Sequence, residues 1–95
     1  MFVIMLKYVK PIEIVEQYLV VHREFLESGY KKNYFIASGP QIPRQGGIIL
    51  SQLKDRIQLE EIINHDPFKI NQIAEYSIIE FDPVKYHENF STFVK

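Results

Sequence analysis

The sequence contains no cysteine, and its charges are nearly balanced at a formal net charge of −1. The absence of cysteine excludes disulfide bonds, thiolate metal sites and cysteine-based catalysis. No basic run is longer than Lys31-Lys32, so nothing in the sequence indicates a nucleic-acid partner. The apolar segment Phe2–Leu6 has no basic leader and is far too short to span a bilayer. We therefore expect a cytoplasmic protein with no membrane partner.

Sequence motifs for cofactors and metals are also missing. Gly46-Gly47 leads into a predicted strand and not into a helix, so it is neither a phosphate loop nor a dinucleotide fingerprint. His22, His65 and His87 are scattered, without the helical spacing of a metal-ligand pair. No Gly-x-Ser-x-Gly nucleophile elbow occurs, which disfavours nucleophilic hydrolysis. The sequence therefore predicts neither a cofactor nor a bound metal.

The length of 95 residues is enough for one domain, which we expect to cover residues 1–95. A hydrophobic content of 46% is too high for a disordered chain and normal for a globular one. A chain this short buries only about 60–65% of its unfolded surface, so its stability is small unless a partner covers more.

A strand followed by a helix is predicted near the start of the chain. Phe2–Tyr8 is an apolar run that predicts a strand buried on both faces. Pro11 suits the first turn of a helix, and Gly29 is expected to end that helix in the left-handed conformation. Residues at spacings of three and four predict one stripe of this helix that faces the sheet: Ile12, Val15, Leu19, His22 and Leu26.

The rest of the chain predicts three further strands and a second helix. Ser38-Gly39-Pro40 is expected to stop the second strand, and Asp55 with Gln58 fits a capping box that starts the helix. The predicted ranges are Tyr34–Ala37, Gly46–Leu50 and Ile73–Phe81 for the strands, Asp55 to Asp66 for the helix, and Val84–Lys95 for a tail that forms a short helix or a packed arm.

The order strand–helix–strand–strand–helix–strand predicts an α+β fold of the ferredoxin-like, split β-α-β type. Two helices cover only one face of such a sheet, yet the strands are apolar on both faces. A bare apolar face would exceed what soluble monomers usually expose. We therefore expect a homodimer in which two sheets pack face to face.

His22 occupies a helix position that the pattern reserves for an apolar side chain. One interpretation is a core histidine that is hydrogen-bonded to the backbone. The other is a titratable group in a cleft between helix and sheet, where small environmental changes move its charge across neutral pH. The pattern alone does not separate the two.

Asp66 precedes Pro67, so it is predicted to cap a new helical turn whose first residue is the proline. Its carboxylate would accept from the N–H of Phe68 or Lys69, and its second oxygen would remain available to an imidazole. Ser38 is either a turn former or a ligand-binding hydroxyl. Arg44 is either a solvated loop charge or a partner for an anionic substrate group.

Several segments together resemble the YCII-related (YciI-like) family over nearly the whole chain. They are His22-Arg23-Glu24-Phe25-Leu26, Ala37-Ser38-Gly39-Pro40, Gly46-Gly47, Asp66-Pro67-Phe68 and Ala74-Glu75-Tyr76. The resemblance implies a ferredoxin-like fold assembled as a dimeric α+β barrel. It also implies a pocket with a histidine–aspartate pair, which corresponds to His22 and Asp66. The substrate-binding residues expected around this pair are Ser38, Gly39, Pro40, Arg44 and Phe68.

The function that follows from this resemblance is proton transfer on a small molecule of unknown identity. His22 would act as a general acid–base oriented by Asp66, in an isomerase-like or lyase-like reaction. The alternative is a non-catalytic module that binds a small molecule or serves as an accessory dimerisation unit. A third interpretation is a purely structural dimerisation unit in which His22 is a satisfied core residue.

Overall fold

The computed structural model describes all residues from 1 to 95, with a four-stranded antiparallel sheet in the order β2-β3-β1-β4. The strands are β1 (Phe2–Tyr8), β2 (Phe35–Pro40), β3 (Gly46–Ser51) and β4 (Ala74–Glu80). The helices are α1 (Ile12–Gln17), α2 (Leu19–Lys31), α3 (Arg56–Ile63), α4 (Pro67–Ile70), the 3-10 turn η1 (Glu88–Phe90) and α5 (Ser91–Val94).

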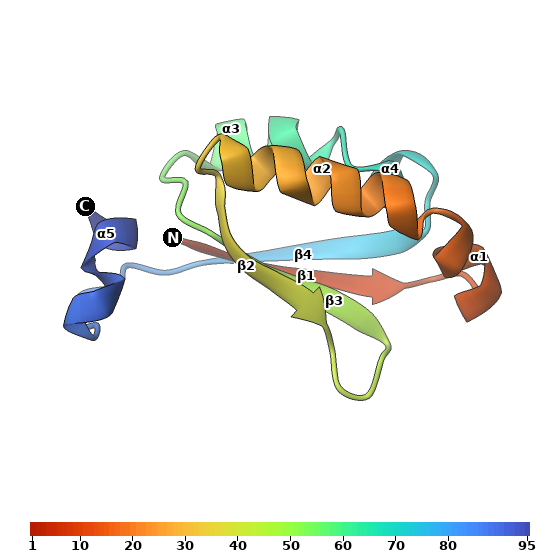
Figure 1. The fold of residues 1–95 in the computed structure, drawn as a ribbon, viewed down its shortest axis with the longest axis horizontal. Coiled ribbons are helices and arrows are strands. Elements are labelled where there is room, and N and C mark those ends of the chain that lie inside the picture. Colours follow the sequence, from red (N-terminus) through yellow and green to blue (C-terminus); the bar gives the residue numbers. More distant parts are fainter.

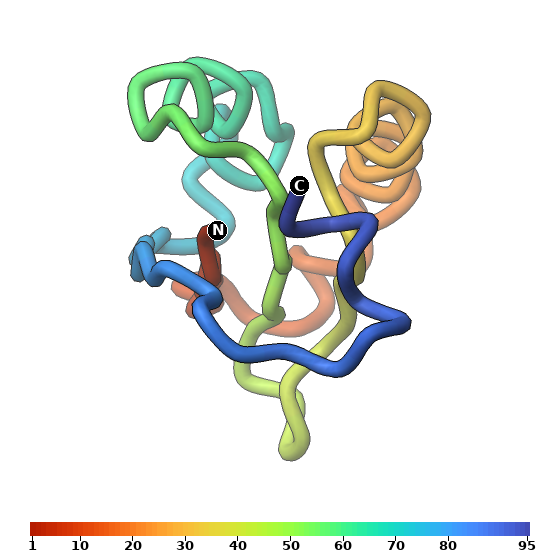
Figure 2. The backbone as a smooth tube through the Cα atoms, turned by 90° about the vertical axis from the view of Figure 1, so that its left-hand side faces the viewer, coloured from red at the N-terminus to blue at the C-terminus, as the bar shows by residue number.

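One face of the sheet carries α2, α3 and α4, and the opposite face carries no helix (Figure 1). Seen from the end of the sheet, α2 lies on one side, while α3 and α4 lie on the other (Figure 2). The two outer strands, β2 and β4, each follow one of these helical segments. The predicted ferredoxin-like α+β fold is therefore confirmed.

The strand register explains how the core forms. Ile4 pairs with Ile49 on β3 and with Ile78 on β4, so these side chains share the helix-covered face. Alternate residues along each strand point to the same face. Ile4 and Ile49 are almost completely buried, and Leu59 and Ile63 reach them from α3. The full buried cluster consists of Phe2, Ile4, Leu6, Val15, Phe35, Ile49, Leu59, Ile63, Phe68, Ile73 and Ala74.

The helix expected between Pro11 and Gly29 differs in two ways. It is interrupted at Tyr18, whose ψ of 3° turns the chain between α1 and α2. The prediction that Gly29 ends the helix is wrong, because α2 continues to Lys31 and Asn33 supplies the left-handed residue, with a φ of 60°. Gly29 is required for packing instead, since a Cβ there would lie 2.2 Å from the ring of Phe35.

The prediction that Ser38-Gly39-Pro40 stops the second strand is also wrong, because these residues are the last three of β2. Pro40 pairs with Gly47, and β2 lies at the edge of the sheet. A proline is tolerated on an edge strand because no further strand needs its missing N–H. Ser38 and Pro40 thereby remain on the sheet, beside α2, and are not carried away by a loop.

Gly46, the first residue of β3, permits a close approach between two backbones. A Cβ at Gly46 would lie 1.7 Å from the carbonyl oxygen of Leu6, so no other residue fits there without moving the strands apart. Gly46 pairs with Lys7, next to the end of β1. The glycine therefore keeps β3 tightly paired with the central strand where both approach the loop of residues 41–45.

The tail forms the two short helical segments η1 and α5, as one of the sequence alternatives predicted. Both chain ends lie at the same end of the sheet (Figures 1 and 2). Phe93 and Val94 border a shallow hollow there together with Met1 and Gln52. None of the helices is long and apolar enough to cross a membrane.

Candidate functional site

His22 lies on the sheet-facing side of α2, where it is 8% exposed and borders a cleft of about 420 Å³. The cleft lies between α2 and the strands, and Tyr8 at the end of β1 and Phe68 on α4 also line it. Two interpretations of His22 were open: a core residue bonded to backbone, and a group beside a cleft. Its ring nitrogen contacts a side chain, and its ring faces a cleft.

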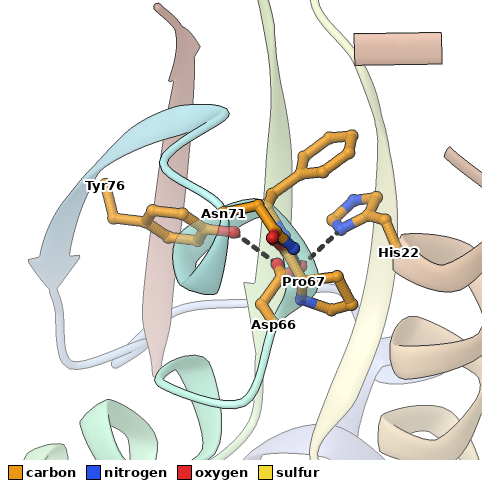
Figure 3. Close-up of polar contacts among 6 residues, drawn as sticks. His22, Asp66, Pro67, Asn71 and Tyr76 are labelled. Carbon is orange, nitrogen blue, oxygen red and sulfur yellow. Dashed lines mark hydrogen bonds and ion pairs between the residues drawn. The ribbon is translucent and has the colours of Figure 1, made fainter. Parts of the chain in front are cut away.

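Asp66 is completely buried and caps α4, as the Asp66-Pro67 pattern predicted. Its Oδ1 accepts the backbone N–H of Phe68 at 3.0 Å and lies 2.8 Å from Nδ1 of His22. The sequence left the second oxygen available to an imidazole, but Oδ2 accepts the hydroxyl of Tyr76 on the opposite side (Figure 3). Oδ1 therefore serves both the cap and the contact with His22.

The proton on this pair can be assigned from the partners of the carboxylate. An ionised carboxylate only accepts hydrogen bonds, so Nδ1 of His22 must donate to Asp66. The other ring nitrogen, Nε2, has no hydrogen bond within the protein. No buried side-chain nitrogen or oxygen lacks a partner, so Nε2 is reached by solvent. Since His22 lines the cleft, Nε2 is the nitrogen available to a bound molecule.

Aromatic contacts fix the plane of the imidazole. The ring of Phe68 stacks on that of His22 with centroids 3.9 Å apart and an interplanar angle of 1°. The ring of Tyr8 packs edge-on against that of Phe68, with centroids 6.1 Å apart and an interplanar angle of 86°. Phe68 also supplies the N–H that Asp66 caps. The short helix α4 therefore positions both the carboxylate of Asp66, which caps it, and the phenyl ring of Phe68, which stacks on His22.

Tyr76 is the residue of this site that the sequence analysis missed. It lies on β4, pairs with Leu6 and donates its hydroxyl to Asp66 from the side opposite His22 (Figure 3). Burial, together with the adjacent carboxylate and this hydrogen bond, raises the pKa of the Tyr76 hydroxyl far above its usual value. The sequence places Tyr76 on a strand, but only the register of β4 against β1 brings it to Asp66.

The structure places the other sequence-predicted residues around the same cleft. Ser38, Gly39 and Pro40 line it from β2, Arg44 from the loop that follows, and Phe68 from α4. Asp66 is not part of the lining and lies behind His22. The hydroxyl of Ser38 is 2.5 Å from that of Tyr30, which holds it at the edge of the cleft. Further lining residues that the sequence did not name as substrate-binding include Leu6, Tyr8, Leu19, Arg23, Leu26 and Ile49.

The other two histidines lie outside this arrangement. His65 is exposed and its Nδ1 is 2.9 Å from the carbonyl oxygen of Glu61, while His87 caps η1 by accepting the N–H of Asn89. No group of three or more histidine, aspartate or glutamate side chains lies close enough to hold a metal ion. The arrangement at His22 is thus a single imidazole with one buried carboxylate and a mostly apolar cleft.

We predict that Tyr76→Phe changes how stability depends on pH. A free tyrosine ionises at about pH 10, but Tyr76 keeps its proton in the folded chain at that pH. Above pH ~10 the unfolded state therefore binds fewer protons than the folded state. The free energy of unfolding therefore falls as the pH rises, with Tyr76 adding up to about 1.4 kcal/mol per pH unit. Tyr76→Phe should lack this contribution to the decrease in the free energy of unfolding. At neutral pH it should be about 1–2 kcal/mol less stable, because Asp66 loses a donor.

Urea unfolding at a series of pH values, followed by circular dichroism, measures this difference. Tyr86→Phe is the matched control, because Tyr86 is exposed and has no hydrogen bond within the protein. Equal slopes above pH 10 in wild type and Tyr76→Phe would contradict the assigned environment of Tyr76.

Comparison with known proteins gives a family and a fold. The sequence model of the YCII-related domain matches residues 1–82. No curated protein sequence matches the chain. One similar solved structure is the 5-chloro-2-hydroxyhydroquinone dehydrochlorinase of Burkholderia phenoliruptrix AC1100 in complex with 2,5-dihydroxybenzoquinone. It superposes with a TM-score of 0.71 at 13% identity, over 94% of this chain and 98% of that chain.

The matched range begins at the first strand and ends just after β4, so it contains His22, Asp66 and Tyr76 and every strand of the sheet. At 13% identity the structural likeness concerns the fold alone. The family match agrees with the resemblance in the sequence segments around His22 and Asp66. This chain belongs to the YCII-related family.

Proposed function

We propose that this protein is an enzyme that transfers protons on a small molecule, with His22 as general acid–base and Asp66 as its orienting partner. The observation that carries the proposal is the difference in surroundings between the two ring nitrogens of His22. Nδ1 is held by a buried carboxylate at 2.8 Å, while Nε2 is open to the cleft. The reaction type we infer is an isomerisation or an elimination.

The chemistry of such a pair is limited to a few steps. A carboxylate on Nδ1 selects one tautomer, so the neutral ring presents the lone pair of Nε2 to the cleft and can accept a proton there. The imidazolium that forms is stabilised by the same carboxylate, and the ring can return its proton to another atom of the substrate. Such general acid–base catalysis contributes roughly 10²–10⁴-fold in rate.

The structural neighbour supports a small cyclic substrate. Its name describes the loss of hydrogen chloride, which is an elimination, and its bound molecule is a quinone. We infer that the cleft of this chain binds a molecule of comparable size, since about 420 Å³ lies within the usual range for ligand pockets. Ser38, Gly39, Pro40, Arg44 and Phe68 are the substrate-binding residues of this proposal.

We predict that the protein accelerates exchange of acidic C–H protons for deuterium in small cyclic ketones and lactones. This exchange needs only proton removal and return, so it detects the proposed chemistry before the natural substrate is known. NMR in D₂O measures the rate. His22→Ala should lower the catalysed rate at least about 100-fold, and Asp66→Asn should lower it less, because an amide still accepts from Nδ1.

His65→Gln is the matched control, because His65 is exposed and lies outside the cleft. Its exchange rate should equal that of the wild type. Equal exchange rates in wild type and His22→Ala would overturn the catalytic role of His22. Failure of the wild type to accelerate exchange in any tested ketone or lactone would favour a non-catalytic binding module.

We also propose that residues 1–95 form one domain that pairs with a second copy through the sheet face without helices. By register, this face carries the apolar residues Val3, Met5, Ile48, Leu50 and Ile79. Ile79 is 50% exposed, and no helix covers this face of the sheet (Figure 1). A contiguous apolar sheet face is the surface that a two-fold dimer buries.

We predict that Ile79→Lys converts a dimer into a monomer, because a lysine charge cannot be buried in an apolar interface without a partner. Sedimentation velocity measures the mass of both proteins. Ile57→Lys is the matched control, since Ile57 is 69% exposed on α3, on the other side of the sheet. A wild type that sediments as a monomer at micromolar concentration would contradict the dimer.

A further inference from the structure

The cleft beside His22 has an uneven charge distribution that the proton-transfer chemistry does not require. Two guanidinium groups line it, Arg23 from α2 and Arg44 from the loop between β2 and β3. No aspartate or glutamate is among the lining residues. The chain as a whole carries a net charge of −1, so the positive cleft is a local feature and not a reflection of overall composition.

Arg44 is held close to the cleft but only weakly paired. Its Nη1 lies 3.7 Å from Oε1 of Glu16, and both side chains are substantially exposed. Exposed ion pairs at this distance contribute little, so Arg44 can exchange this partner for another anion at small cost. Its guanidinium also lies 5.9 Å from the ring centroid of Tyr8, which lines the cleft. Arg44 is therefore positioned over the cleft and is available to a ligand.

The lining of the cleft is mostly apolar away from the two arginines. Half of the lining residues are hydrophobic, and they include Phe68, which stacks on the ring of His22. An apolar lining suits a carbon skeleton, and the two guanidinium groups suit a negative charge on that skeleton.

We propose that the ligand of this cleft is a small organic carboxylate whose negative charge is bound by Arg44, with Arg23 contributing. The proposal rests on the proposed function only in placing the ligand at the His22 cleft. Guanidinium groups bind carboxylates through two parallel N–H···O bonds, which also fixes the orientation of the bound molecule. Arg44 and Arg23 thus set which molecules reach Nε2 of His22, and they take no part in proton transfer.

The experiment compares charged and neutral probes of the same shape. Benzoate and benzamide, and phenylacetate and phenylacetamide, are titrated into the full chain to millimolar concentration, and binding is followed by chemical-shift changes of backbone amides in NMR. We expect each carboxylate to bind at least about tenfold more tightly than its amide, with shifts around the cleft. Arg44→Gln should weaken carboxylate binding at least about tenfold, because the charge-assisted contact of the guanidinium is lost.

Two further variants sharpen the test. Arg56→Gln is the matched control, because Arg56 pairs with Glu60 on α3, outside the cleft, and its loss should leave carboxylate binding unchanged. Glu16→Gln removes the competing partner of Arg44 and should tighten carboxylate binding about two- to threefold. An opposite response to Glu16→Gln would contradict the availability of Arg44 to a ligand.

Equal binding of carboxylates and amides, no binding by any carboxylate, or carboxylate binding that is unaffected by Arg44→Gln would overturn the proposal. These outcomes do not depend on catalysis by His22. Conversely, carboxylates bound through Arg44 without any exchange catalysed by His22 would uphold this inference while the proposed enzymatic function fails. The two proposals are therefore separated by different measurements on the same variants.

Discussion

The buried carboxylate of Asp66 is the group on which the rest of the site depends. Three donors from different parts of the chain converge on it: His22 from α2, the backbone of Phe68 on α4, and Tyr76 from β4. A buried carboxylate is costly unless it is fully hydrogen-bonded, so the three donors stabilise it together. Because each donor belongs to a different element, this one charge also joins α2, α4 and the sheet. The site and the local fold are stabilised by the same contacts.

The sheet determines where the cleft opens. α2 lies over β2 and β3, and the edge position of β2 lets Ser38, Gly39 and Pro40 face the cleft without a further strand beside them. Gly46 keeps β3 against β1, and the loop that follows β2 brings Arg44 over Tyr8.

Much of this arrangement was predictable from local patterns, and the failures have clear physical causes. The strand and helix order gave the ferredoxin-like fold, and Asp66-Pro67 correctly predicted the cap on α4. Gly29 was misassigned as a helix end because local preference cannot reveal that Phe35 packs against it. Tyr76 was missed because its contact with Asp66 depends on the register of β4 against β1, a non-local pairing without a sequence signature. The choice of Oδ1 for both Phe68 and His22 depends in the same way on tertiary packing.

The measurement that tests this account most directly is the tautomer of neutral His22, read from the ¹⁵N shifts of its two ring nitrogens by NMR. The account predicts that Nδ1 carries the proton, bonded to Asp66, and that Nε2 is the unprotonated nitrogen facing the cleft. His65, whose Nδ1 contacts the carbonyl oxygen of Glu61, provides an internal reference for a protonated Nδ1. A His22 ring that carries its proton on Nε2, with Nδ1 unprotonated, would contradict the account, because Nε2 would have no lone pair to accept a proton from a substrate.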